Sequence, residues 1–169
     1  EFSQKVQEIQ EILVQRGIGY QDKVAILSQN SPSWAIAYFA VVDMGAVAVP
    51  LLPDFTKEEI TNCINHSDSK MIFVSERLSE KIEIQDYQYI ETIINLDNFE
   101  ISYDKQIQTK GSKSIPQPED LAEIIYTSGT SGFSKGVMLT HGNLASQLVQ
   151  IHHIWAIKED DVYLSVLPL

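Results

Sequence analysis

Apolar residues alternate between helical spacing and short unbroken runs from residue 4 to residue 96. Val6, Ile9 and Leu13 recur at helical spacing, whereas residues 23–27 (KVAIL) form a short apolar run typical of a buried strand. Helices and strands should therefore alternate along this part of the chain. The pattern predicts helices over residues 4–16, 32–44 and 56–66, and strands over residues 23–27, 46–49, 70–74 and 92–96.

Start and stop signals bound the predicted helices. Ser31 followed by Pro32 is typical of an N-cap and a first helical turn. Thr56 and Glu59 have the spacing of a capping box, and Gly45 is typical of a helix end. The resulting order of strand, helix, strand, helix, strand predicts an α/β fold, with a mostly parallel sheet and flanking helices. The nearly continuous apolar strands favour the same class, because strands of parallel sheets are buried on both faces.

Residues 34–52 are apolar except for Asp43 and are long enough by count to cross a bilayer. Ser31 and Gly45 bound a helix that is too short for this. The following strand, residues 46–49, should be closed by Pro50. We therefore interpret the segment as a buried helix followed by a buried strand.

Composition and charge exclude several classes of protein. The chain has 169 residues, 12 Lys and Arg against 23 Asp and Glu, and a net charge of −11. This acidic balance argues against a nucleic-acid partner, which needs clustered basic residues. The single cysteine, Cys63, excludes an internal disulfide framework and a zinc site built from several cysteines, and it fits a cytoplasmic location.

The ends of the chain lead us to expect that the sequence is truncated. It starts at Glu1 without an initiator Met, and Glu8 lies where a signal peptide would be apolar. It stops in the apolar run 162–169. Within the chain, residues 76–104 hold eight acids and two bases, and residues 99–119 are polar. We expect an exposed connection near 99–119, which is the best internal boundary.

The segment richest in chemistry is a Ser/Thr/Gly loop, residues 127–136 (TSGTSGFSKG), between apolar strands over 120–126 and 137–140. Glycines let backbone N–H groups approach an anion, hydroxyls donate hydrogen bonds, and Lys135 adds a positive charge. This composition predicts a polyphosphate site. A flexible Ser/Gly linker is the alternative, but the flanking apolar strands disfavour it. The loop is not an ordinary P-loop, because Lys135 is followed by Gly136 and a strand.

Residues 126–141 (YTSGTSGFSKGVMLTH) closely resemble the phosphate-loop signature of the acyl-adenylate-forming enzymes. These include acyl-CoA synthetases, luciferases and peptide-synthetase adenylation domains. The usual pattern, Tyr-Thr-Ser-Gly-Thr-Thr-Gly-x-Pro-Lys-Gly-Val, differs here at Ser131 and Ser134. Ser131 keeps a hydroxyl, whereas Ser134 lacks the φ restraint of proline. Residues 22–35 and 45–51 also resemble N-terminal blocks of this family.

The resemblance implies an ATP-dependent acid–thiol ligase that needs Mg²⁺. A carboxylate attacks the α-phosphate of ATP to give an acyl-adenylate, and CoA then takes the acyl group. Residues 139–144 (LTHGNL) and 161–169 look most like long-chain fatty acyl-CoA synthetases, which implies a fatty acid as substrate and allows peripheral membrane contact. An adenylating enzyme for another carboxylic acid, or a non-catalytic nucleotide-binding module, remains an alternative. The residues expected to hold the β- and γ-phosphates are Thr127, Ser128, Gly129, Thr130, Ser131, Gly132 and Lys135.

The resemblance covers nearly the whole chain and implies that residues 1–169 are the N-terminal portion of the AMP-binding (adenylation) domain. The family's adenine and ribose motifs, magnesium-binding glutamate and catalytic lysine would then lie downstream. We therefore expect no catalytic residue and no metal ligand within this segment, and no ligase activity from it alone.

Other chemically active side chains are interpreted as structural. His152 and His153 point to different helix faces, and no third metal ligand is near in sequence. His141 follows Thr140, a candidate N-cap, and a packing or capping role is favoured over catalysis. Cys63 is expected to be a buried thiol. Residues 159–161 are expected to form a solvated turn, and Trp34 and Trp155 to be core or partly buried aromatics.

Overall fold

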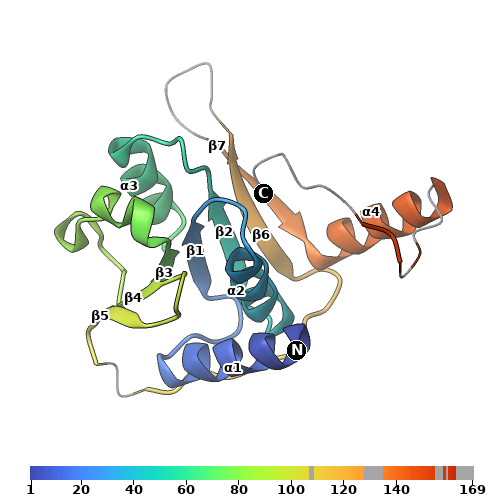
Figure 1. The fold of residues 1–169 in the computed structure, drawn as a ribbon, viewed down its shortest axis with the longest axis horizontal. Coiled ribbons are helices and arrows are strands. Elements are labelled where there is room, and N and C mark those ends of the chain that lie inside the picture. The colour runs from blue at the N-terminus through green and yellow to red at the C-terminus, as the bar shows by residue number, and fades with distance from the viewer. Residues whose placement is uncertain (107–108, 128–134, 155–157, 159, 163–169) are drawn as a thin grey trace.

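A computed structural model describes residues 1–106, 109–127, 135–154, 158 and 160–162 of the chain (Figure 1). Helices and strands alternate in its first half, as the apolar pattern predicts. The elements are α1 Phe2–Gln15, β1 Lys23–Leu27, α2 Pro32–Asp43, β2 Val47–Leu51, α3 Lys57–His66, β3 Met71–Val74, the 3₁₀ helices η1 Glu76–Lys81 and η2 Ile84–Asp86, β4 Thr92–Asn95, β5 Ile101–Asp104, β6 Leu121–Thr127, β7 Lys135–Thr140 and α4 His141–Ile154.

The described strands form one sheet in the order β5-β4-β3-β1-β2-β6-β7. The pairs β1–β2, β1–β3, β3–β4 and β2–β6 are parallel, and antiparallel strands, β5 and β7, lie at the two edges. The prediction of an α/β fold with a mostly parallel sheet is therefore confirmed.

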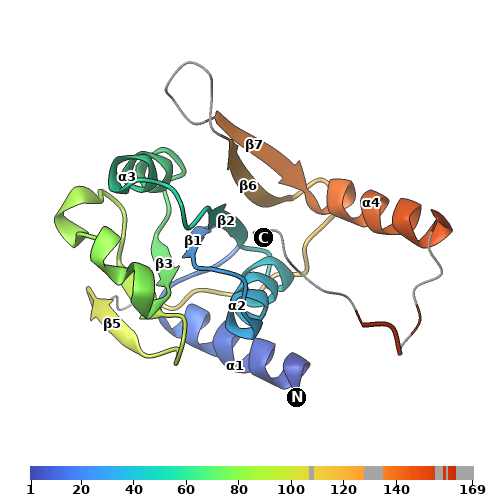
Figure 2. The same ribbon diagram turned by 45° about the horizontal axis from the view of Figure 1, so that its top comes forward.

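Helices cover both faces of the central strands. On one face α1 and α2 pack over Ile26 and Phe73, and on the other α3 packs over Leu27 and Ile72 (Figures 1 and 2). Consecutive residues of β1 and β3 thus enter two separate hydrophobic clusters. This explains why these strands are continuously apolar in sequence.

The predicted helix caps are present. The side chain of Ser31 accepts a hydrogen bond from the Trp34 amide at 3.0 Å, with Pro32 in the first turn of α2. At α3, the Glu59 amide donates to Thr56 Oγ1 (3.2 Å), and Glu59 Oε2 accepts from the Thr56 amide (2.8 Å). Each cap pairs backbone donors that the first helical turn would otherwise leave unpaired.

One predicted strand end was wrong, and one strand was not predicted. Pro50 does not close the strand after residue 49, because it lies within β2 and pairs in register with Ile26. The connection near 99–119 begins with a strand, β5, which a tight turn at Phe99 (φ 59°) folds back against β4. Polar edge strands lack the buried pattern that identified the central strands.

The described residues in the rest of that connection are mostly exposed, but hydrogen bonds attach the connection to the core. The Gly111 amide donates to the Val14 carbonyl at 2.8 Å, and the Ser114 amide donates to the Met44 carbonyl at 3.0 Å. A Cβ on Gly111 would lie 1.8 Å from the carbonyl oxygen of Ile18, so only glycine fits there. The connection thus follows the ends of α1 and α2.

None of the helices in the described parts of the chain is long and apolar enough to cross a membrane. The apolar stretch from Trp34 divides into α2, of 12 residues, and β2, as its helix start and stop residues predict.

Candidate functional site

The β6–β7 hairpin brings the two ends of the predicted phosphate loop together. Thr127, the last residue of β6, is the register partner of Lys135, the first residue of β7. Both strands extend further toward the loop than the sequence pattern indicated. The other predicted phosphate-binding residues, Ser128, Gly129, Thr130, Ser131 and Gly132, lie outside the described residues.

The side chains of Thr127 and Lys135 are both exposed. Lys135 forms no ion pair with any residue that the structure describes. A hydroxyl and an ammonium group that face solvent at neighbouring positions are available to an incoming anion. This arrangement suits the phosphates of a nucleotide.

Tyr126, directly before Thr127, is fixed from both sides. Its side chain is buried, and its hydroxyl lies 2.8 Å from Nδ1 of His66 at the end of α3. The same ring lies against the backbone of Gly136 in β7, where a Cβ would be 3.4 Å from Cε1 of the tyrosine. Sequence reasoning missed His66, because 60 residues separate it from Tyr126 and no local pattern connects them.

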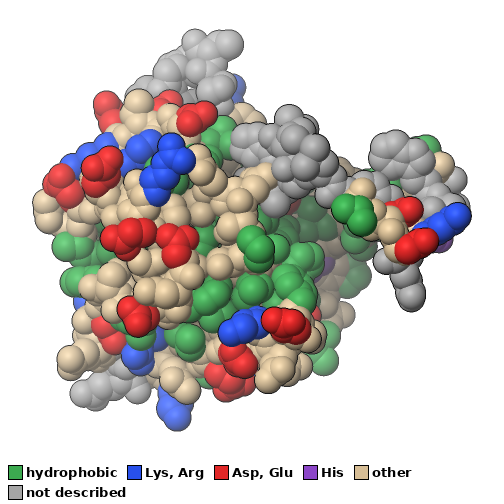
Figure 3. Space-filling view, in the orientation of Figure 1, with side chains coloured by type: hydrophobic (Ala, Val, Ile, Leu, Met, Phe, Trp, Pro, Cys, Tyr) green, Lys and Arg blue, Asp and Glu red, His purple; other side chains and the backbone are tan. Residues whose placement is uncertain are grey.

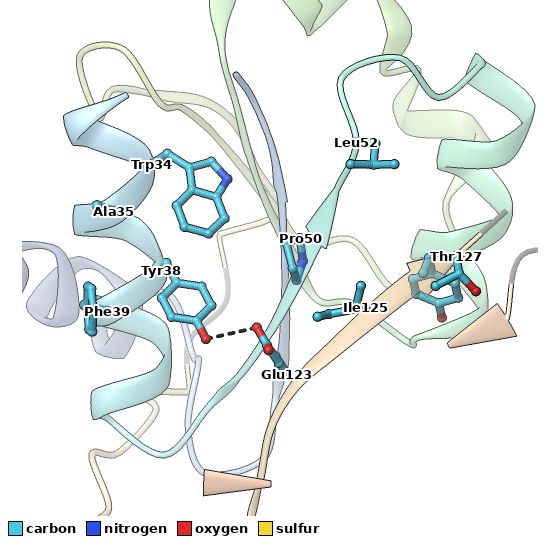
Figure 4. Close-up of a pocket in the computed structure, with 10 residues that line it drawn as sticks. Trp34, Ala35, Tyr38, Phe39, Pro50, Leu52, Glu123, Ile125 and Thr127 are labelled. Atoms are coloured by element: carbon cyan, nitrogen blue, oxygen red, sulfur yellow. Dashed lines mark hydrogen bonds between the residues drawn. The ribbon is translucent and has the colours of Figure 1, made fainter. Parts of the chain in front are cut away.

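A pocket of about 720 Å³ lies between α2 and β6, next to Thr127 (Figure 4). The register recorded between β2 and β6 is the single pair Ala48–Glu123, whereas β2 continues to pair with β1 through Pro50. Pro50 has no N–H to donate. The pocket opens beyond that last pair, where Pro50 and Ile125 line its wall.

The pocket holds a buried carboxyl group among aromatic side chains. Tyr38 donates a hydrogen bond from its hydroxyl to Glu123 Oε2 at 2.9 Å, and its ring stacks on Trp34 with centroids 5.2 Å apart (Figure 4). Burial raises the pKa of Glu123, and the hydrogen bond from Tyr38 opposes this shift. Burial, reinforced by the charge of Glu123, also raises the pKa of Tyr38. Glu123 was not among the residues singled out from the sequence, because one acid in an apolar strand carries no motif.

The structure places His66 at the end of α3 and His141 at the start of α4, apart from the consecutive His152 and His153. His141 begins α4, which Thr140 caps: the Asn143 amide donates to Thr140 Oγ1 at 3.2 Å. Burial lowers the pKa of His141, and the charge of Asp120 opposes this effect. His152 is exposed on α4, and the side chain of His153 lies outside the described residues.

The remaining candidates have structural surroundings. Cys63 is buried in the cluster under α3, and Trp34 is buried in the cluster under α2. Lys158 donates its amide to the Asp161 carboxylate at 2.9 Å, which closes the predicted turn, whereas Trp155 and Glu159 lie outside the described residues. Among the described residues, no three His, Cys, Asp or Glu side chains are grouped closely enough to hold a metal ion.

Comparison with known proteins identifies the class. The chain matches the family "AMP-binding enzyme" over residues 1–169. It is 30% identical to fatty acyl-CoA synthetase A of Dictyostelium discoideum, covering 93% of this chain and 26% of the relative. It is 28% identical to the crotonobetaine/carnitine–CoA ligase of Escherichia fergusonii, covering 99% of this chain and 35% of the relative.

The fold agrees with the sequence match. The crystal structure of ATP-bound MatB from Rhodopseudomonas palustris superposes with a TM-score of 0.80 at 27% identity, covering 99% of this chain and 34% of that one. The chain therefore belongs to the AMP-binding family of adenylate-forming enzymes. It spans about a quarter to a third of the length of these three relatives.

Proposed function

We propose that this chain is the N-terminal portion of the adenylation domain of an ATP-dependent acid–thiol ligase. The observation that carries the proposal is the β6–β7 hairpin, which sets Thr127 opposite Lys135 at the two ends of the signature loop. Family membership and the match to an ATP-bound structure support it.

In this proposal the loop binds the β- and γ-phosphates of ATP and the departing pyrophosphate. Thr127, Ser128, Gly129, Thr130, Ser131 and Gly132 supply hydroxyl and amide donors, and Lys135 supplies positive charge. These local donors offset the repulsion between a nucleotide and a chain of net charge −11. A carboxylate oxygen attacks the α-phosphorus, and the bond to the bridging oxygen breaks to release pyrophosphate. The CoA thiol then attacks the acyl carbon and releases AMP.

Magnesium enters this scheme with the nucleotide. Among the described residues no three His, Cys, Asp or Glu side chains are grouped for a metal, and the family resemblance places the magnesium-binding glutamate beyond residue 169. When bound to ATP, Mg²⁺ neutralises part of the phosphate charge. The residues of this chain would contact the phosphates rather than the metal.

We further propose a long-chain fatty acid as the substrate. The resemblance of residues 139–144 and 161–169 to long-chain synthetases supports this choice, and the name of the Dictyostelium relative supports a fatty acid. The name of the Escherichia fergusonii relative supports another acid as the second candidate. With a long-chain acid, peripheral contact of the whole enzyme with membranes would bring it to its substrate.

Pyrophosphate release by the full-length protein tests the proposal. The protein would be supplied with ATP, Mg²⁺ and CoA, and with palmitate, acetate, benzoate or an amino acid in turn. We expect release with palmitate. Release with another of these acids would keep the adenylation chemistry and refute the fatty-acid assignment. No release with any of them, together with no MgATP binding, would refute the proposed activity. The 169-residue chain alone should release none.

The role of Lys135 has its own test in the full-length protein. Lys135→Ala removes one charge-assisted contact, which should cost roughly 1.5–3 kcal/mol of phosphate binding. MgATP affinity should fall accordingly, measured by calorimetric titration. Lys105→Ala, an exposed lysine beyond the edge strand β5, is the matched control and should change nothing. Equal affinity of Lys135→Ala and the wild type would remove Lys135 from the phosphate site.

A further inference from the structure

Near its loop end, the β6–β7 hairpin contacts the core cluster under α3 through the side chains of Ile124 and Tyr126. β7 is the last strand of the sheet, and none of its six residues is buried. β6 pairs with β2 at Glu123, three positions before Tyr126. The ends of the predicted phosphate loop, Thr127 and Lys135, lie beyond the β2–β6 pair that Glu123 forms. Side-chain contacts must therefore hold this part of the hairpin against the body of the fold.

Tyr126 supplies that contact. Its ring lies against the Gly136 backbone, so one side chain touches both strands of the hairpin. A Cβ at Gly136 would be 3.0 Å from Cγ2 of Ile124 and 3.4 Å from the tyrosine ring, so the close fit depends on glycine. In register, Tyr126 faces Gly136, and the next pair is Thr127 with Lys135.

The hydroxyl of Tyr126 reaches the opposite partner, helix α3. It lies 2.8 Å from His66 Nδ1, and the two rings meet edge to face with centroids 5.8 Å apart. His66 is the last residue of α3, a helix that is capped at its start and packed on the sheet through Ile60 and Ile64. Helix α3 therefore holds His66 in a fixed position for its hydrogen bond with Tyr126. Ser67 also interacts with the tyrosine hydroxyl, and Cys63 and Asp68 act on it electrostatically.

We propose that His66 is a positioning residue for the phosphate-binding hairpin and acts through Tyr126. The His66–Tyr126 bond fixes the tyrosine ring, and the ring fixes the stem from which Thr127 and Lys135 are presented. His66 itself does not touch the nucleotide. The inference rests on the proposed function for its effect on ATP, but the fixing of the hairpin can be measured without a ligand.

The test compares variants of the full-length protein. His66→Ala and Tyr126→Phe each remove the bond. His66→Asn places an amide group where Nδ1 lies and should restore most of it. Asn62→Ala, at an exposed position of α3, is the matched control. Amide hydrogen exchange over residues 124–127 and 135–138 is compared with exchange in β1 and β3, and MgATP dissociation constants are measured by calorimetry.

We expect His66→Ala and Tyr126→Phe to speed exchange in the hairpin stem but not in β1 or β3. Each should weaken MgATP binding by about threefold to tenfold, as expected for one hydrogen bond. The double variant should be no worse than either single variant, because both remove the same interaction. His66→Asn should recover most of the loss.

Unchanged exchange in the stem would overturn the proposal, and so would additive losses in the double variant. A fall in melting temperature with unaltered MgATP affinity would also overturn it, because the bond would then be merely structural. If the wild-type protein binds no MgATP, the proposed function fails, and the exchange data decide the role of His66 by themselves.

Discussion

The centre of the sheet and its β7 edge both contain apolar residues in strands, but these residues are buried to different degrees. All four residues of β3 are buried, and Met71 is fully inaccessible. In β7, Met138 is 69% exposed, and in the adjoining α4 Leu148 is 67% exposed. In both ribbon views α4 extends away from the body of the molecule (Figures 1 and 2).

This difference shows that an apolar run in the sequence can be buried but need not be. It becomes buried only where another helix or strand packs against it. α1, α2 and α3 cover the central strands, whereas in the described part of the chain no helix covers the exposed side of β7. Exposed hydrophobic side chains also gather over the face that α2 occupies (Figure 3). Contiguous apolar surface of this kind is typical of contact sites.

The largest expected contrast between the two regions is between two methionines in strands. Met71→Ala should lower the free energy of unfolding by roughly 2–5 kcal/mol, because it leaves a cavity in the core. Met138→Ala should change it by about 0.5 kcal/mol or less, because that side chain is already in water. Urea unfolding of the 169-residue chain measures both. Equal losses would show that the β7 face is covered in solution.

A second contrast concerns two threonine caps. Thr56→Ala removes the capping box of α3, which packs on the sheet, and should cost about 1 kcal/mol of global stability. Thr140→Ala removes the corresponding cap of α4, whose side chains are mostly exposed. Its main effect should be faster amide exchange in the first turn of α4, with little change in the urea midpoint. A large midpoint shift would mean that α4 is integral to the core.

The smallest expected effect concerns Glu123, where the two regions meet. Its pKa is raised by burial, so the folded state favours the protonated form. Stability from this group is present below the unfolded pKa and is lost as pH rises through the folded pKa. Glu123→Gln should therefore be at least as stable as the wild type near pH 7.

In thermal melts, the stability of the wild type relative to Glu123→Gln should rise as pH falls from neutrality toward the ordinary glutamate pKa of about 4.3. Glu119→Gln, an exposed acid nearby, is the matched control and should show no such trend. A stability difference that is independent of pH would mean that the carboxyl of Glu123 is well solvated.

Much of the fold was predictable, because its signals are local. Ser31 with Pro32 and Thr56 with Glu59 fixed where two helices begin, through contacts within one helical turn. The failures have a common cause. Pro50 and the polar strand β5 were misjudged because strand membership depends on a partner strand, which a local pattern does not contain. The phosphate loop is shorter than predicted for the same reason, because β6 and β7 pair as far as Thr127 and Lys135.

The sequence by itself determined the fold class, the helix caps and the identity of the signature loop, since each depends on the spacing of neighbouring residues. The tertiary structure alone decided which apolar runs are buried, because burial depends on what packs against them. It also brought His66 to Tyr126 and Tyr38 to Glu123 across 60 and 85 residues. The topology of the chain determines these long-range contacts. A short-range sequence pattern carries no information about which distant segment lies alongside.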